Sequence, residues 1–177
     1  MSPSPPAFLP TPAEYAPFYA TYIAALGDAD IMDVLERQES ELSALLKPLS
    51  EEQVGFRYAE GKWSIREVVG HMADAERIFG TRMLRFARGD QAPLPGFDEK
   101  PYVAASSYDA WTMADLLDQF AALRQANLLL IRHLDEVALL RAGRASGQEV
   151  SVRALVAILA GHAAHHLRVL RERYLAD

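Results

Sequence analysis

Two histidines in the last predicted helix have the spacing of a metal-binding pair. The helix is predicted over residues 151–175, and His162 and His166 lie four residues apart within it. This spacing places both imidazoles on the same side of a helix, one turn apart. Leu155 and Leu159 lead into His162 at helical spacing, so the histidines continue the stripe that the helix would bury. Two buried imidazoles are costly unless each finds a partner, and one divalent metal ion satisfies both together.

A third ligand is available in a different predicted helix. A catalytic zinc-like site takes three protein ligands and keeps one position open for water or substrate. His71 lies beside the apolar stripe of a helix predicted over residues 64–88, and a helical bundle can bring it to face His162 and His166. We therefore predict that His71, His162 and His166 bind a divalent metal ion. The alternative interpretation is that the three histidines are simply hydrogen-bonded in the core.

His165 and Asp74 are the other candidates near this site. His165 follows His162 by three residues and could replace His166 in the pair, but it sits to one side of the apolar stripe. We expect His165 to hydrogen-bond to the site from outside the coordination sphere, or to face solvent. Asp74, one turn after His71, is the candidate catalytic residue: it could orient a ligand imidazole, accept a proton from water at the ion, or coordinate the ion. The alternative for Asp74 is a polar position at the edge of the bundle.

The composition limits the classes of protein and of site. The chain has 177 residues, of which 50% are hydrophobic, and this favours a single domain over residues 11–177 after a loose, proline-rich tail over residues 1–10. There is no cysteine, so a thiolate metal site and a cysteine nucleophile are both excluded. The net charge of −6 argues against binding to nucleic acid. Because no apolar run is long enough to span a membrane and no targeting signal is seen, we expect a cytoplasmic protein that does not bind membranes.

The hydrophobic periodicity predicts an all-α four-helix bundle with a short N-terminal helical extension. The extension begins at a capping box formed by Thr11 and Glu14, and it should lie across the main body or across a partner subunit. The four long helices are predicted over residues 31–49, 64–88, 112–134 and 151–175. The third of these is predicted to bury Leu116, Phe120, Leu123, Asn127, Ile131 and Leu134.

The connections between these helices differ in length. Residues 50–62 form a polar connection, and residues 91–111 show no regular periodicity. A connection as long as 91–111 crosses a bundle end or covers a site, and Phe97, Asp98 and Tyr102 are the residues that could cover it. Residues 141–150 form a short turn region, so the third and fourth helices are predicted to be antiparallel neighbours.

Four segments of the sequence resemble the DinB/YfiT-like superfamily of metal-binding four-helix bundles. They are Lys62–Glu76, Arg85–Asp90, Pro95–Asp98 and Gly161–His166. The resemblance implies that His71, His162 and His166 are the ligands of zinc, nickel or another divalent ion, and that the protein forms a homodimer. The sequence departs from the pattern of the superfamily at Ala163 and Ala164, where many relatives carry a polar residue.

Two hypotheses about function follow from the residues and the resemblance. The first is a metal-dependent enzyme of the hydrolase or thiol S-transferase type, in which the ion lowers the pKa of a water molecule or of a low-molecular-weight thiol. Because the chain has no cysteine, such a thiol would come from a cofactor. The second is a non-catalytic dimeric protein in which the metal only stabilises the bundle. A role in a stress response would fit such a protein.

Overall fold

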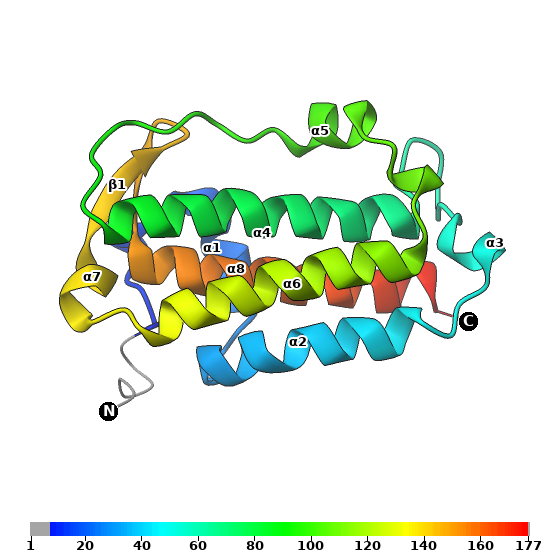
Figure 1. The fold of residues 1–177 in the computed structure, drawn as a ribbon, viewed down its shortest axis with the longest axis horizontal. Coiled ribbons are helices and arrows are strands. Elements are labelled where there is room, and N and C mark those ends of the chain that lie inside the picture. The colour runs from blue at the N-terminus through cyan, green and yellow to red at the C-terminus, as the bar shows by residue number, and fades with distance from the viewer. Residues whose placement is uncertain (1–7, 177) are drawn as a thin grey trace.

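Four long helices form the body of the molecule in a computed structural model that describes residues 8–176. They are α2 (Ile31–Leu46), α4 (Ile65–Ala87), α6 (Met113–Arg132) and α8 (Val152–Val169). Figure 1 shows them side by side, and a π-helical turn (Leu170–Tyr174) extends α8. The predicted four-helix bundle is confirmed. Within residues 8–176, no helix combines the length and the apolar character needed to cross a lipid bilayer.

Each long helix begins where the sequence carries a capping residue. The side chains of Asp30, Ser64, Thr112 and Ser151 accept hydrogen bonds from main-chain N–H groups in the first turns of α2, α4, α6 and α8. Such caps satisfy N–H groups that have no partner inside the helix. The helix α4 ends just before Gly89, whose φ of 80° is costly for other residues. Local chemistry therefore sets where the long helices begin.

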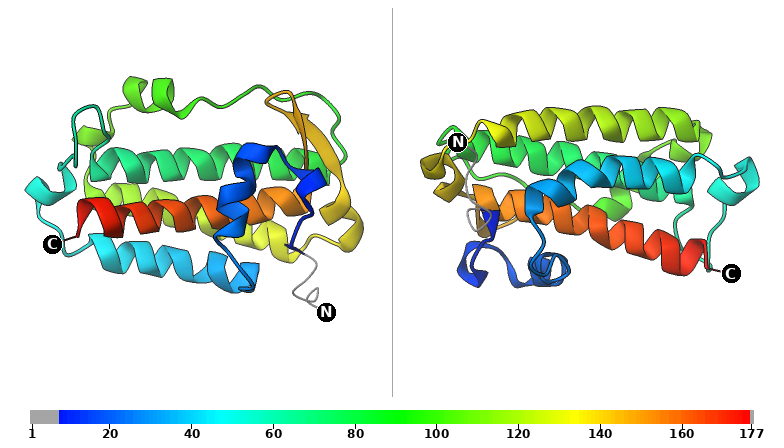
Figure 2. Two further views of the ribbon diagram at one scale, coloured as in Figure 1. Left: turned by 180° about the vertical axis from the view of Figure 1, so that it is seen from behind. Right: turned by 90° about the horizontal axis from the view of Figure 1, so that it is seen from below.

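The order of the helices around the bundle differs from the predicted one. Both α2 and α4 pack against α6 and against α8, so α6 and α8 occupy opposite corners of the bundle. The colours in Figures 1 and 2 show α4 and α6 running in one direction and α2 and α8 in the other. The third and fourth long helices are therefore antiparallel, as predicted, but the prediction that they are neighbours is wrong. The reason is that the connection between them is long enough to cross the end of the bundle.

That connection contains a short helix and a β-hairpin that were not predicted from the sequence. Residues 133–151 form the short helix α7 (Glu136–Leu140) and a hairpin of β1 (Ala142–Ala145) and β2 (Gln148–Ser151). The strands pair antiparallel, with Ala142 opposite Ser151, and Ser146 and Gly147 make the turn with φ values of 55° and 75°. Positive φ at both turn residues matches the twist of a two-residue hairpin. The interpretation of 141–150 as a simple turn region is thus corrected.

The connection between α4 and α6 returns along the length of α4. Because α4 and α6 are parallel neighbours, the chain must travel back before α6 can begin, and Figure 1 shows this segment passing over α4. It contains α5 (Glu99–Ala105) and a 3₁₀ turn (Tyr108–Ala110), where no regular structure was expected. After α7 and α5, a third helix that was not predicted is α3 (Glu51–Val54), in the connection from α2 to α4.

The N-terminal extension lies across α8 of the same chain. It consists of two 3₁₀ turns, Pro12–Glu14 and Pro17–Tyr19, and the helix α1 (Ala20–Ala24), which packs on α8. The capping box predicted at Thr11 is present. Contact with α8 is close because residue 161 is glycine: a Cβ atom there would lie 2.3 Å from the main-chain oxygen of Tyr22. Of the loose tail predicted over 1–10, residues 1–7 lie outside the described range, and Phe8 packs in the core.

A buried polar network ties all four long helices together. Arg124 is 1% exposed, and its guanidinium donates to the Glu76 carboxylate (3.2 and 2.5 Å), to the main-chain oxygen of Leu35 (2.9 Å) and to Gln38 (2.7 Å). The Gln38 amide in turn donates to the main-chain oxygen of Ala160 in α8 (2.7 Å). The buried face predicted for α6 did not include Arg124, so that prediction is incomplete. Burial of the Arg124 guanidinium is tolerated because its N–H groups donate to the Glu76 carboxylate and to two further oxygen atoms.

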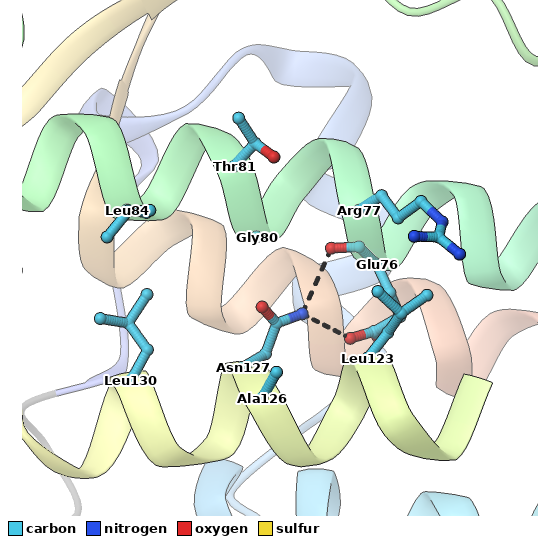
Figure 3. A pocket seen from close by; sticks show the side chains of 9 residues that line it. All are labelled: Glu76, Arg77, Gly80, Thr81, Leu84, Leu123, Ala126, Asn127 and Leu130. Carbon is cyan, nitrogen blue, oxygen red and sulfur yellow. Dashed lines mark hydrogen bonds between the residues drawn. The ribbon is translucent and has the colours of Figure 1, made fainter. Parts of the chain in front are cut away.

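Asn127 completes the network at the surface between α4 and α6. Its amide nitrogen donates to the carboxylate and to the main-chain oxygen of Glu76, at 2.8 and 3.2 Å, as Figure 3 shows. Asn127 and Leu123, both predicted to be buried, are only half-buried. They line a pocket of about 520 Å³, which none of the five histidines lines.

Candidate metal centre

The structure brings together His71 from α4 and His162 and His166 from α8. The Nε2 atom of His162 lies 3.0 Å from Nε2 of His71 and 3.2 Å from Nε2 of His166. One nitrogen atom from each of the three rings lies within 4.8 Å of the others. His71 and His162 are buried, and His166 is partly exposed. The structure therefore brings the two histidines selected by their spacing together with His71, which was selected for its place beside an apolar stripe.

These distances fit the donor set of a single small ion. With Zn–N bonds of about 2.0–2.1 Å, two ligand nitrogens in a tetrahedral arrangement are about 3.3 Å apart. The two separations of 3.0 and 3.2 Å are close to this value. A hydrogen bond could occupy only one of the two approaches to His162 Nε2, because a ring nitrogen has one proton or one lone pair. The arrangement is thus better suited to a shared cation than to a chain of hydrogen bonds.

The environment keeps the three imidazoles neutral, which is the form that binds metal. Burial, with a smaller contribution from the nearby His165, lowers the pKa of His71 to about 4. Burial is also the largest cause that lowers the pKa of His162 and His166 well below the usual value. The neighbouring histidines lower it by a smaller amount. A neutral imidazole offers its lone pair to an ion without first losing a proton.

Asp74 does not hydrogen-bond to the His71 ring, as the predicted role of orienting a ligand imidazole would require. The Nδ1 atom of His71 is buried and has no hydrogen-bond partner among residues 8–176, so Asp74 does not orient this ring. Burial raises the pKa of Asp74, and a hydrogen bond with the Tyr108 hydroxyl and the charge of Arg77 partly offset this. Asp74 therefore faces Tyr108, and its assignment as a proton acceptor stays a prediction.

His165 lies beside the three converging rings without joining them. Its ring centroid is 5.1 Å from that of His166 and 5.3 Å from that of Tyr22. It is half-buried, and its Nδ1 and Nε2 atoms are outside the group formed by the other three. The choice of His166 over His165 as a ligand stays a prediction, as does any role for His165 in supporting the ligands.

Aromatic side chains surround the three histidines on several sides. The Trp63 ring lies 5.0 Å from His71, and the Phe97 ring stacks parallel to His71 at 6.2 Å. Tyr22 and Phe79 lie 5.7 and 6.0 Å from His162. Phe97 comes from the connection that returns along α4, so this connection does cover the site. The surrounding rings reduce access of water to the buried histidines.

The other two covering residues predicted in this connection have different positions. Tyr102 packs edge-on against Phe97, with ring centroids 4.9 Å apart. Asp98 caps α5 by accepting a hydrogen bond from the main-chain N–H of Lys100 (3.2 Å). Tyr102 therefore packs against Phe97, the ring that covers His71, and Asp98 stabilises the start of α5.

One side of the site opens into a pocket of about 570 Å³. His165 and His166 line it, and Trp63, Lys62 and Lys100 are among its other lining residues. Neither lysine was predicted to have a role. No local pattern connects them, because they lie in two different connections of the chain.

Comparisons with known proteins bear on this arrangement. Residues 34–170 match the family model of the DinB superfamily. The chain belongs to the DinB superfamily. A curated relative from Oceanobacillus iheyensis, named "Putative metal-dependent hydrolase OB0413", is 28% identical over 136 residues, which cover 75% of this chain and 77% of that protein.

The fold of this DinB superfamily member is also that of a solved structure. The match is to YfiT from Bacillus subtilis, with a TM-score of 0.72 and 18% identity, covering 92% of this chain and 89% of that one. That structure is described as a probable metal-dependent hydrolase with an unusual four-helix bundle topology. In this chain, the diagonal placement of α6 and α8 departs from a simple up-and-down bundle, in which consecutive helices are neighbours.

Proposed function

We propose that this DinB superfamily protein is a metal-dependent hydrolase, with His71, His162 and His166 holding a zinc or nickel ion. The observation that carries the proposal is the convergence of the Nε2 atoms of these residues from two helices. The name of the Oceanobacillus iheyensis relative supports the reaction class. An ion bound there would act as a Lewis acid that makes water, or a thiol, acidic enough to react near neutral pH.

The chain's own residues provide the remaining requirements of such a site. His162 and His166 lie one helical turn apart in α8, and α4 packs on α8. Together these features hold the three imidazoles in place before any ligand arrives. The rings of Trp63 and Phe97 cover His71 and limit access of bulk water. The pocket that reaches His166 provides space for a substrate, with its reacting bond toward the histidines.

A metal-bound thiol cofactor is the alternative nucleophile, and a purely structural ion is the non-catalytic alternative. Ester and amide hydrolysis should therefore be measured in parallel with transfer of low-molecular-weight thiols to electrophiles, using protein loaded with zinc or with nickel. We expect hydrolysis that disappears on chelation and returns when the ion is added back. His166→Ala is the matched inactive control.

The outcomes separate the three functions. Thiol transfer without hydrolysis would replace the proposed reaction by the transferase type. Stoichiometric metal with no turnover in either assay would favour the structural ion. Absence of stoichiometric metal would contradict the site itself.

A further inference from the structure

The pocket beside His166 holds two of the three lysines of the chain. Lys62 lies just before α4, and Lys100 lies in α5; the third lysine, Lys47, follows α2 elsewhere in the molecule. The two pocket lysines come from different connections, and they meet because the segment after α4 returns to the end where α4 begins (Figure 1). In a chain with a net charge of −6, this is a local concentration of positive charge next to the candidate metal centre.

Neither pocket lysine has its charge neutralised by a carboxylate. Every ion pair formed among residues 8–176 uses an arginine, so the ammonium groups of Lys62 and Lys100 have no such partner there. The Lys62 ammonium lies 5.8 Å from the centre of the Tyr58 ring. Lysine ammonium groups on a pocket wall are available donors for an anionic ligand group.

The other residues that line the pocket indicate the charge and the apolar character of the ligand it would bind. Glu99 also lines the pocket, next to Lys100 in the chain. Trp63, Tyr58 and Tyr174 supply flat apolar surface, with the two tyrosine rings 4.8 Å apart. Apart from the charge of an ion at the histidines, two lysines and one glutamate leave one net positive charge, which matches one carboxylate better than a dianionic phosphate.

We propose that this pocket selects substrates that carry a free carboxylate, held by Lys62 and Lys100 while the bond to be cleaved lies at the histidines. The inference rests on the proposed function, since it places the reacting end of the substrate at the ion. It adds the chemical class of the substrate: a small acid with an apolar or aromatic portion, in place of a neutral ester or amide.

The test uses a two-headed probe and the full chain loaded with Co²⁺. Each probe carries a hydroxamate to bind the ion and a terminal carboxylate, separated by aliphatic spacers of different length, and each is compared with the same molecule ending in a neutral amide. Visible absorption of the cobalt reports binding at the ion, and titration calorimetry gives the affinity. The variants are Lys62→Gln/Lys100→Gln and the matched control Lys47→Gln, the change of the remaining lysine.

We expect the best acid probe to bind about fivefold more tightly than its amide, as two partly exposed ion pairs allow. The preference should disappear in the double variant, persist in Lys47→Gln, and shrink at high salt because the charges are solvent-accessible. Equal affinity for acid and amide, together with a clear cobalt signal, would overturn this inference and leave the metal centre intact. A wild-type protein that shows no cobalt signal with either probe would overturn the proposed function, and this inference with it.

Discussion

At the scale of single residues, the histidines of α8 occupy positions that leucines fill one and two turns earlier. His162 is 7% exposed and His71 is 5% exposed, so each ring has lost most of its contact with water. Burial of a polar ring without a partner is unfavourable, and the Nδ1 atom of His71 is already unpaired among the described residues. A cation shared at the three Nε2 atoms would compensate for this cost.

The first prediction concerns which histidines bind the ion. His71→Ala and His166→Ala should abolish stoichiometric metal binding, because two imidazoles hold an ion far less tightly than three. His165→Ala should weaken binding only modestly, since its ring is outside the converging group. Metal content after dialysis and calorimetric titration measure this. Equal loss in all three variants would mean that His165 is a ligand.

The second prediction concerns the buried pair of Glu76 and Arg124, whose side chains are 3% and 1% exposed. Glu76→Gln should lower the free energy of unfolding by about 3–5 kcal/mol, because it leaves a buried guanidinium without its counter-charge. Urea denaturation provides the measurement. The matched control is Glu36→Gln, which breaks the ion pair of α2 with Arg132 on α6 at 45% exposure of both side chains and should cost at most about 1 kcal/mol. Similar losses in both variants would show that the network is not a special stabilising element.

At the scale of elements, the return of the chain along α4 creates the site's surroundings. Parallel packing of α4 and α6 requires this return, and it brings Phe97 over His71 and Lys100 to the pocket. The N-terminal extension covers the opposite side, where Tyr22 contacts both His162 and His165. Neither segment is part of the four long helices, yet each contributes a wall of the site.

The third prediction concerns the attachment of the N-terminal extension. Glu14 accepts hydrogen bonds from Ser151 (2.8 Å) and from Arg153 (2.7 and 2.6 Å) at the start of α8. Burial raises the pKa of Glu14, but hydrogen bonds, led by those from Arg153, outweigh it and lower the pKa from 4.5 to about 2. A carboxyl group with a lowered pKa stabilises the fold above its unfolded pKa and loses this contribution as pH falls toward its folded pKa.

Glu14→Gln should therefore destabilise the protein by about 1–2 kcal/mol near pH 7, a value reduced for partial exposure of the pair. The difference from the wild type should shrink between about pH 4.5 and pH 2, measured by urea denaturation at each pH. A difference that stays constant across this range would show that the charge of Glu14 is not what attaches the extension.

At the scale of the whole molecule, a polar layer separates two hydrophobic clusters. One cluster contains Leu35, Phe79 and Leu128, and the other contains Leu42, Met72 and Phe120. Between them along the helices lie Gln38, Glu76 and Arg124 of the buried network, with His71 and His162 of the candidate metal centre close by. The network connects all four long helices through protein hydrogen bonds alone.

The fourth prediction follows from this division of the core. Removal of the ion should leave a folded protein, because both clusters and the network are formed without it. The melting temperature should fall by about 5–15 °C, as expected for loss of a ligand present at 100 to 1,000 times its Kd. Calorimetry of the chelated and metal-loaded forms measures this shift. An apo form with no cooperative transition would indicate that the ion is structural.

Three expectations about the whole molecule stay predictions: the homodimer implied by the resemblance, the cytoplasmic location, and the absence of a nucleic-acid partner. Sedimentation of the metal-loaded protein tests the first of these. The separate question of a carboxylate-bearing substrate is addressed by the hydroxamate probes.

The sequence by itself determined the local features of this protein. The long helices begin close to the predicted residues 31, 64, 112 and 151. Local chemistry explains this agreement, because the side chains that cap them there, those of Asp30, Ser64, Thr112 and Ser151, act within three residues of themselves. The spacing of His162 and His166 placed them on one face, because the period of a helix is constant. The buried position of His71 followed from its place beside an apolar stripe.

Only the tertiary structure decided which faces meet. Periodicity shows that a helix has an apolar face but not which helix covers it, so the diagonal placement of α6 and α8 could not be predicted from pattern. The burial of Arg124 depends on partners 48, 86 and 89 residues away in the chain, and the meeting of Lys62 and Lys100 depends on the path of an irregular connection. Such contacts form between distant segments, and no residue within a local window carries a signal for them.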